Sequence, residues 1–410
     1  MRNGCYNIDG YICMEECLMK YKNAKNIFPD DILEALQKYV QGEYVYIPIK
    51  DKATNTNITE YRMEVKKRDE HIYTKSLEGL SNRKLSQIYC LSESSIRRII
   101  INQRKRYNRT KEMIENVLEN WNAEETTIKQ VYDSAWQVGE EFVLKVYDNV
   151  GALNRNIKML SILDDIGIPV SKLVRTKTDA MYVNEGEVYY ILTEKLRGNN
   201  IIQLCDVPDI GNKMGAVIAR LHLAFKECES QDEFWNNSLL AEMEGWILDT
   251  LRKDNWQFVK KEQFESTLSG LKEAYDDLPV GLIHRDVHLG NFLFEGGEFS
   301  GYIDFDLSQR NIRLFDLCYF MLGLLSEEET IEISYDEWFV ILGQVFSGYN
   351  QIIGLSEQEI ATVPYVMESI ELLFGAWFIG QDDVACARDA IKLYEFVCEN
   401  RERIVKNIYS

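Results

Sequence analysis

Apolar residues in the first quarter of the chain recur at the spacing of helices. PDDILEALQKYVQ opens with a proline and two acids, as helix starts do, and its apolar side chains fall on one face; YVYIPI then predicts a short strand. Residues 77–108 predict two short helices separated by the turn YCLS, with Ser92 as the N-cap of the second. The apolar positions expected inside these two helices are Leu80, Leu85, Ile88, Ile96, Ile99 and Ile100.

The turn between these helices has the length found in a helix-turn-helix, although it carries Cys90 where glycine is usual. The second helix would turn polar and basic side chains outward, and a basic run follows it: Ser94, Ser95, Arg97, Arg98, Arg104, Lys105 and Arg106. Paired short helices with exposed arginines also occur in proteins that never touch DNA. The pattern therefore leaves DNA binding and a purely structural role open.

Farther along the chain the pattern changes to the alternation of strands. RTKEMIENVLENWN is predicted as an amphipathic helix, and TTIKQVY, AWQV and EEFVLKVYD follow as three strands. Lys145 lies on an otherwise apolar face of the third strand, where it either extends to water or pairs with an anion. A helix, NRNIKMLSILDDIG, and a hairpin, MYVNEGEVYYILTEKL, follow, and the chain beyond Gly198 is predicted to be mostly helical.

One short hairpin interrupts this helical part. NFLF and FSGYIDF are predicted strands joined by EGGE, a strong turn signal, and their pairing would bring Asn291 beside Asp304. Asp286, on the preceding loop, can reach the same place. One amide oxygen and two carboxylates suit Mg²⁺, which completes its shell with phosphate and water. They do not suit zinc, so we interpret His284 as a loop anchor and His288 as its structural neighbour.

Composition and charge divide the chain further. With 410 residues and 46% hydrophobic side chains, it is long enough for two or three globular domains. Residues 1–111 hold 21 basic and 14 acidic side chains, whereas the remainder holds 25 and 52. The basic part could therefore meet a polyanion, and the acidic part would suit a neutral or cationic small molecule.

Targeting signals and cysteine spacing point to an intracellular protein. No run of eighteen apolar residues appears, and the N-terminus carries charges where a signal peptide needs an apolar stretch. We therefore expect a soluble, cytoplasmic protein that makes no membrane contact. The nine cysteines lie scattered without CxxC spacing, which favours free thiols over disulfides or zinc ligands.

HRDVHLGN, followed by IDFD and FDLCYF, resembles the aminoglycoside phosphotransferase and choline kinase superfamily over about residues 110–410. GAVIARLH matches the helix that packs beneath the site in that superfamily. The resemblance implies an α+β, bilobal protein-kinase-like fold, with a small antiparallel-sheet lobe over 109–197 and a mainly helical lobe over 198–410. It also implies transfer of phosphate from ATP, with Mg²⁺, to a hydroxyl of a small molecule.

The resemblance assigns roles to individual residues. Asp286 would act as general base toward the substrate hydroxyl, and Asn291 and Asp304 would hold Mg²⁺ on the ATP phosphates. The other implied roles are Lys145 pairing with the α- and β-phosphates, Glu194 and Leu196 offering backbone groups to adenine, and Asp316 bracing the catalytic loop.

Two departures from the superfamily pattern concern the nucleotide. The phosphate loop, VYDSAW, has no glycine, although Ser134 and Ala135 are small enough to let backbone amides approach phosphate. Asn156 falls where a helix glutamate usually orients the lysine. An amide can hydrogen-bond Lys145 but cannot neutralise it, so either catalysis is adapted to the change or the nucleotide binds weakly.

The N-terminal part resembles the Mor-type transcription-activator family over about residues 20–106, which implies a helix-turn-helix domain over 1–108 that binds double-stranded DNA. Three hypotheses follow. The chain is a small-molecule kinase fused to this domain, a transcription regulator whose kinase-like lobe senses a ligand without turnover, or an inactive scaffold that forms a homodimer through its N-terminal part.

Acidic runs suggest the charge of the acceptor. Most such runs form a solvated surface, but some of these carboxylates could line the acceptor site and favour an amine-bearing molecule, such as an amino sugar, an aminoglycoside or an amino alcohol. Candidate aromatic walls for such a cation are Trp235, Trp338 and Trp377. The runs cover 229–235, 326–338 and 381–389, where no lysine partner is obvious nearby.

Overall fold

The fold is taken from a computed structural model, in which the chain divides into two compact units between Asn116 and Val117. The predicted boundary after residue 108 lies earlier. No break occurs at residue 108, because one continuous helix, α4 (Glu93–Leu118), extends through it, and the units divide only near the C-terminal end of this helix. The predicted helix at 109–122 is therefore the C-terminal part of α4. The first predicted helix and strand lie outside the described residues, which are 68–89, 91–123, 127–132, 134–201, 204, 207, 209–326 and 333–409.

The described part of the first unit is a cluster of three helices: one over 68–77, α3 (Asn82–Ile88) and the start of α4. The Ser92 hydroxyl accepts a hydrogen bond from the Ser95 amide at 3.1 Å, which confirms the predicted cap. Ile88, expected in the core, is 39% exposed, because Leu85 and Tyr89 one turn apart form the buried face of this short helix. The core residues are Ile72, Leu85, Tyr89, Ile96 and Ile99.

The second unit begins with a small lobe built on an antiparallel sheet. The three predicted strands are confirmed, and the sheet runs in the order β1-β2-β3-β6-β4, with β5 paired to β6. Leu153 and Ile157 of the following helix pack with Ile191 of the sheet. The elements are β1 (Ile128–Tyr132), β2 (Ala135–Val138), β3 (Phe142–Tyr147), α5 (Val150–Asp165), β4 (Leu173–Val174), β5 (Val183–Glu185) and β6 (Val188–Glu194).

The larger lobe is mainly helical, as predicted, with three short strand pairings. Gly296 and Gly297 have φ of 60° and 82° and close a two-residue turn between β9 and β10, which confirms the predicted hairpin. The strands are β7 (Asn199–Asn200), β8 (Val280–Ile283), β9 (Phe292–Glu295), β10 (Glu298–Tyr302) and β11 (Gln309–Ile312). The helices up to β11 are α6 (Ile210–Gln231), α7 (Leu239–Glu242), η3 (Met243–Ile247), α8 (Leu248–Lys253), α9 (Lys261–Tyr275) and η4 (Leu289–Asn291).

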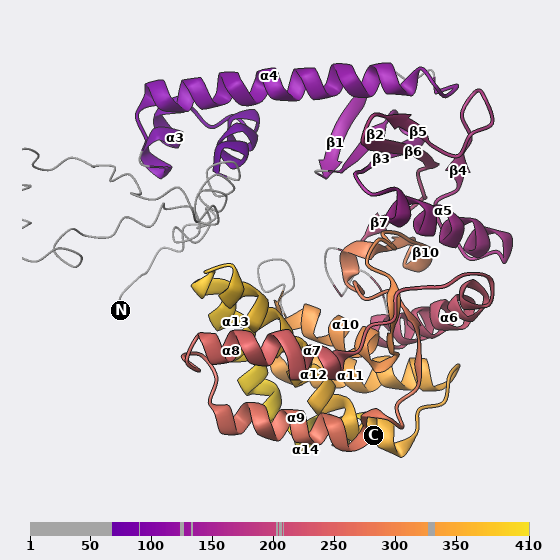
Figure 1. Ribbon diagram of the computed structural model, residues 1–410, viewed down its shortest axis with the longest axis vertical. Helices are drawn as coiled ribbons and strands as arrows, with labels where there is room; N and C mark the ends of the chain where they lie inside the picture. The colour runs from indigo at the N-terminus through magenta and orange to yellow at the C-terminus, as the bar shows by residue number, and fades with distance from the viewer. Residues whose placement is uncertain are drawn as a thin grey trace, which may run out of the picture. The chain divides into compact units, whose positions relative to one another are not determined.

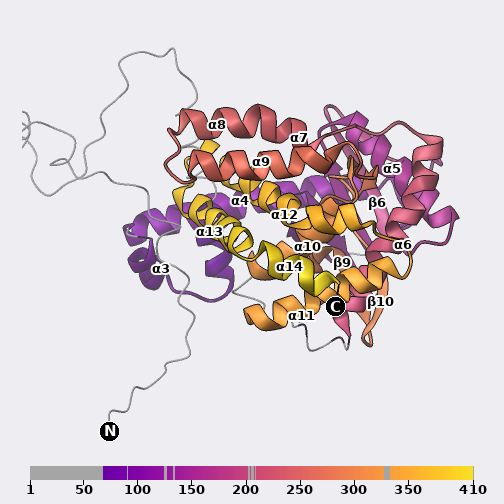
Figure 2. The ribbon, with the colours of Figure 1, turned by 90° about the horizontal axis from the view of Figure 1, so that it is seen from below.

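Five further helices complete the core of this lobe: α10 (Leu314–Ser326), α11 (Tyr335–Asn350), α12 (Glu357–Gly380), α13 (Val384–Glu399) and α14 (Arg401–Ile408). Helix α6 crosses α11 closely at Gly215. The absence of a side chain permits this approach, since a Cβ at Gly215 would overlap the Val345 carbonyl. Helix α12 lies among α9, α10 and α13 in both views (Figures 1 and 2). It is long and apolar enough to span a membrane, but 67% of its apolar window is buried, as in the core helix of a globular domain.

Candidate functional site

The loop between β8 and β9 is held by one buried carboxylate. Asp316, at the start of α10, accepts hydrogen bonds from the backbone amides of His284 at 2.8 Å and Arg285 at 2.9 Å. Its Oδ2 also lies 2.9 Å from Nε2 of the buried His222. Arg285 has a φ of 69°, a left-handed conformation that such contacts keep in place. Asp316 thus fixes the backbone that leads into Asp286.

The two histidines of the loop lie in different surroundings. His284 is fully buried, and its Nε2 lies 3.1 Å from the carbonyl oxygen of Ile303, which precedes Asp304. Burial lowers the pKa of His284 and outweighs the opposing influence of Asp316, so the ring is neutral at neutral pH. His288 is partly exposed, and its Nδ1 accepts a hydrogen bond from the Gly290 amide at 3.1 Å. Both arrangements hold the loop.

Asp286 is oriented from two directions. Its Oδ2 accepts a hydrogen bond from the Asn291 side-chain amide at 3.0 Å, and its Oδ1 accepts one from the Tyr319 hydroxyl at 3.0 Å. Sequence reasoning missed Tyr319, although its position three residues after Asp316 places it on the same face of α10. That spacing, within FDLCYF, was the available signal.

The hairpin register brings Asn291 and Asp304 together as predicted. The amide of Ile303 donates to the Asn291 carbonyl at 3.1 Å, so Asp304 follows directly beside Asn291. Asp304 has a φ of 63°, a strained conformation for a side-chain-bearing residue and one that clusters at functional sites. The Asn291 side-chain oxygen accepts no hydrogen bond within the described part of the chain, which leaves it available to a cation.

These oxygen atoms fit a hard divalent cation such as Mg²⁺. Asn291 and Asp304 would provide one neutral and one anionic oxygen ligand to such a cation, and Asp304 is half-exposed. Across the described residues, no group of three or more His, Cys, Asp or Glu is arranged to hold a metal.

Lys145 does not extend to water, since it pairs with two carboxylates. Its Nζ lies 2.8 Å from Oδ1 of Asp304 and 2.9 Å from Oδ2 of Asp306. Burial would lower the pKa of Lys145, but the two carboxylates outweigh it, and the pKa is raised. Burial would likewise raise the pKa of Asp304, yet the nearby ammonium group holds it below its ordinary value.

Asp306 is a second residue that sequence reasoning missed. Its Oδ1 accepts hydrogen bonds from the Tyr147 hydroxyl, at 2.9 Å, and from the side-chain amide of Asn156. The same amide contacts the Tyr147 hydroxyl at 2.9 Å. Asn156 is therefore linked to Lys145 through Asp306, which both side chains contact.

The other nucleotide-site candidates lie along the small lobe. Ala135 pairs with Lys145 across the sheet, and the Ser134 carbonyl accepts from the Val146 amide at 2.8 Å, so the glycine-free turn ends next to the lysine. At the end of β6, the Glu194 amide donates to the Lys172 carbonyl at 2.8 Å. Leu196 packs against Gly301 of β10, where an added side chain would collide with it.

Four carboxylates of the acidic runs, for which no lysine partner is obvious nearby in the sequence, form ion pairs. Long-range ion pairs join Glu229 to Arg310, Asp232 to Lys158 and Asp336 to Arg403, and a local one joins Asp389 to Lys392. These carboxylates therefore belong to surface ion pairs.

The three tryptophans also differ. Trp338 is fully buried and donates to the Met321 carbonyl at 2.7 Å, so it is part of the core and not a wall for a cation. Trp235 and Trp377 are 65% and 51% exposed.

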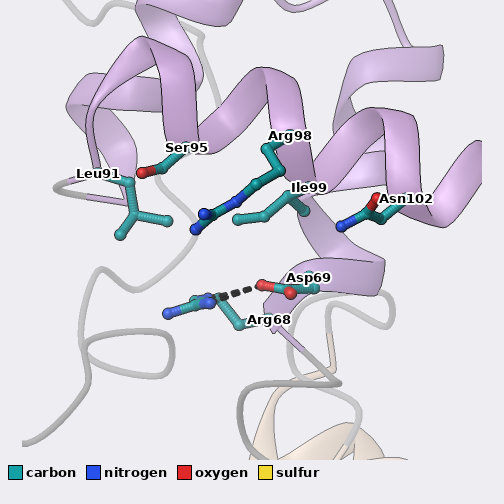
Figure 3. A pocket seen from close by; sticks show the side chains of 7 residues that line it. All are labelled: Arg68, Asp69, Leu91, Ser95, Arg98, Ile99 and Asn102. Atoms are coloured by element: carbon teal, nitrogen blue, oxygen red, sulfur yellow. Dashed lines mark hydrogen bonds and ion pairs between the residues drawn. The ribbon is translucent and has the colours of Figure 1, made fainter.

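The predicted DNA-binding residues lie on α4. Ser94, Arg97, Arg98 and Arg104 are exposed and Ser95 is half-buried, whereas the side chains of Lys105 and Arg106 lie outside the described residues. Arg98, Ser95 and Asn102 of α4 line a hollow with a volume of about 490 Å³. Figure 3 shows the side chains of this hollow. Across it lies Arg68, whose guanidinium group pairs with Asp69 at 2.6 Å.

Residues 125–337, slightly more than half of the chain, match the model of the phosphotransferase enzyme family. The chain belongs to this family. Among curated relatives, this phosphotransferase is similar to the homoserine kinase of Polaromonas naphthalenivorans, with 24% identity over 58% of this chain and 74% of the relative. It is also similar to that of Gluconobacter oxydans, with 27% identity over 40% of this chain and 50% of the relative. The chain thus spans only about half the length of the second relative.

Solved structures show the same fold. An amicoumacin kinase in complex with AMP-PNP and Ca²⁺ has a TM-score of 0.53 and 16% identity, and the match covers 72% of this chain and 93% of that one. A microcompartment-associated aminopropanol kinase has a TM-score of 0.51 and 17% identity, covering 72% and 97%. The antiparallel-sheet lobe and the helical lobe of this phosphotransferase are therefore those of a kinase-like fold.

Proposed function

We propose that this chain transfers a phosphoryl group from ATP to a hydroxyl of a small molecule, with Mg²⁺. The observation that carries the proposal is the convergence of one oriented carboxylate, two oxygen ligands and one lysine at the point where the two lobes of the second unit meet. Phosphoryl transfer requires mainly alignment and charge neutralisation, and these groups can supply both.

Each residue has one task in this proposal. Asp286, held by Tyr319 and Asn291, accepts the proton of the acceptor hydroxyl. As that O–H bond breaks, the hydroxyl oxygen bonds to the γ-phosphorus and ADP leaves with the electrons of the cleaved P–O bond. Lys145 pairs with the phosphates. Mg²⁺, held by Asn291 and Asp304, would neutralise charge that develops on the phosphate oxygens.

The remaining nucleotide contacts are proposed from position. The turn at Ser134 and Ala135 lies beside Lys145, and its backbone amides would approach the phosphates. Backbone groups at Glu194 and Leu196 would form hydrogen bonds with adenine. His284 and Asp316 support the loop without touching the substrate. We expect this enzyme in the cytoplasm, where ATP is available.

For the acceptor, we propose an amine-bearing hydroxyl compound of the amino-alcohol, amino-sugar or aminoglycoside type. The support is the similarity to a homoserine kinase and an aminopropanol kinase, together with the acidic composition after residue 111. The test is a screen of homoserine, amino alcohols, amino sugars and aminoglycosides for ATP consumption with Mg²⁺. Asp286→Asn serves as the inactive control. If the wild-type protein binds ATP but does not consume it with any of these acceptors, the result would favour the alternative, a regulator whose kinase-like lobe senses a ligand without turnover.

We propose a second function for the three-helix unit, the binding of double-stranded DNA. The observation that favours it is that Arg97 and Arg98 are exposed on α4 and form no ion pair with any described residue. The full-length protein should bind duplex DNA with an affinity that falls steeply as salt rises, and Arg97→Ala with Arg98→Ala should reduce that slope by about two. If no duplex binds at low salt, the unit has a structural or homodimer-forming role instead. The homodimer itself stays a prediction.

A further inference from the structure

The position on α5 where a glutamate is expected to orient the lysine holds Asn156. Its side chain is 5% exposed, and its Nδ2 donates to both Asp306 and Tyr147. An amide carries no charge, so Asn156 cannot balance the ammonium group of Lys145. Another group must do so if the lysine is to keep one orientation while phosphates arrive and leave.

Asp306 has the geometry for this task. One of its oxygens, Oδ2, lies 2.9 Å from Lys145 Nζ, and the other, Oδ1, accepts from Tyr147 and Asn156. The two neutral donors fix the carboxylate without competing for the lysine. Burial, and then the charge of Asp306, raises the pKa of Tyr147, so its hydroxyl stays a donor throughout the physiological range.

Asp304 cannot replace Asp306 in this respect. It also contacts Lys145, but under the proposed function it is a ligand of Mg²⁺, so its charge is shared with the metal when the nucleotide binds. Among the described residues, Asp306 is then the carboxylate whose negative charge is not shared with the metal and stays paired with Lys145. Its carboxylate is partly shielded, with 38% of the side chain exposed.

We propose that Asp306 replaces the missing helix glutamate as the positioning residue of Lys145, with Tyr147 and Asn156 holding it in place. The negative charge has moved from α5 to the segment after β10, and the helix position supplies a hydrogen-bond donor to the relocated carboxylate. The proposal rests on the proposed function, because it concerns how the lysine is prepared for ATP phosphates.

The test uses the full-length protein and four variants. Asp306→Asn removes the charge but keeps the shape, Asn156→Glu restores the usual helix carboxylate, and the double variant exchanges the two. Asp148→Asn is the matched control, because it removes an exposed carboxylate just after β3 that forms no ion pair with a described residue. Binding of a fluorescent ATP analogue is measured with and without Mg²⁺, together with KM for ATP and for the acceptor.

Asp306→Asn should weaken nucleotide binding and raise KM for ATP by about tenfold or more, because a charge-assisted contact to Lys145 is lost. KM for the acceptor should stay unchanged, and so should the melting temperature within about 2 °C, since the site is partly exposed. The double variant should recover most of the lost affinity. This rescue would not occur if Asp306 were merely part of the packing.

Three outcomes would overturn the proposal. Unchanged nucleotide binding in Asp306→Asn would mean that Asp306 does not position the lysine. A loss confined to Mg²⁺-containing buffer and not rescued by Asn156→Glu would make Asp306 a metal ligand. Equal losses in Asp148→Asn would indicate a general effect of charge. Because binding is measured without an acceptor, failure to find any turnover would count against the proposed function and leave this test intact.

Discussion

The two sides of the candidate site are built on different principles. The catalytic loop of the large lobe is held by buried groups that form hydrogen bonds. Asp316 accepts hydrogen bonds from two backbone amides of the loop and lies within hydrogen-bond distance of His222. On the small-lobe side, Lys145 is held by two partly exposed carboxylates, and the expected helix glutamate is absent. The comparison teaches that backbone hydrogen bonds to one buried carboxylate fix the loop, whereas the orientation of Lys145 depends on side-chain ion pairs with residues far along the chain.

The largest expected effect separates these two sides. Asp286→Asn keeps the size of the side chain, retains one acceptor oxygen in place of the two that Tyr319 and Asn291 contact, and removes the base, so turnover should fall by about a hundredfold or more. Nucleotide affinity should stay close to that of the wild type. Asp304→Ala should instead lose the part of the affinity that depends on Mg²⁺. Single-turnover rates and ATP-analogue titrations check both, and wild-type turnover in the two variants would refute the assignment.

Contacts between residues close in the sequence could be predicted, and contacts between distant residues could not. Asn291 and Asp304 could be brought together because Gly296–Gly297 fixes a hairpin register, which is a local rule. The change in charge near residue 111 favours a boundary there, but no glycine or proline interrupts residues 93–118, so α4 continues as one helix.

Contacts between distant segments could not be predicted in the same way. Asp306 meets Asn156 across 150 residues, and Lys158 meets Asp232 across the surface of the lobes. No periodicity or spacing encodes such pairs, because they depend on how finished elements pack. Tyr319 is an intermediate case, since its helix face was predictable and its partner was not.

A second prediction sharpens the comparison on the catalytic-loop side. Tyr319→Phe removes one hydrogen bond to Asp286 and leaves the ring stacked with Phe315. Turnover should fall by about tenfold, in line with the loss of one hydrogen bond to a charged group, while KM for ATP stays unchanged. Steady-state kinetics with both substrates varied is the measurement. A raised KM for ATP would place Tyr319 on the nucleotide side instead.

The smallest expected effect on turnover concerns a buried carboxylate that lacks the partners of Asp316. Glu371 of α12 is 5% exposed and forms no hydrogen bond or ion pair with a described residue. Burial raises its pKa to about 8. The side chain is therefore protonated in the native protein at pH 7, and Glu371→Gln, which is neutral and of the same shape, should change turnover at pH 7 by less than about twofold.

The effect of Glu371 should appear in the pH dependence of stability. The folded pKa of about 8 lies above the ordinary value of 4.5, so the native state binds a proton that the unfolded chain releases between these values. The free energy of unfolding should thus fall by about 1.4 kcal/mol per pH unit as pH rises through that window and level off above it. Glu371→Gln should abolish this contribution and be more stable than the wild type at pH 8 to 9. Denaturant unfolding from pH 5 to 9 measures it. Glu368→Gln is the control, because Glu368, also on α12, pairs with Arg401 of α14, and the loss of that pair should destabilise the protein. If the wild type and Glu371→Gln show parallel pH profiles, Glu371 is ionised in the native state and has a partner that the apolar surroundings of α12 do not suggest.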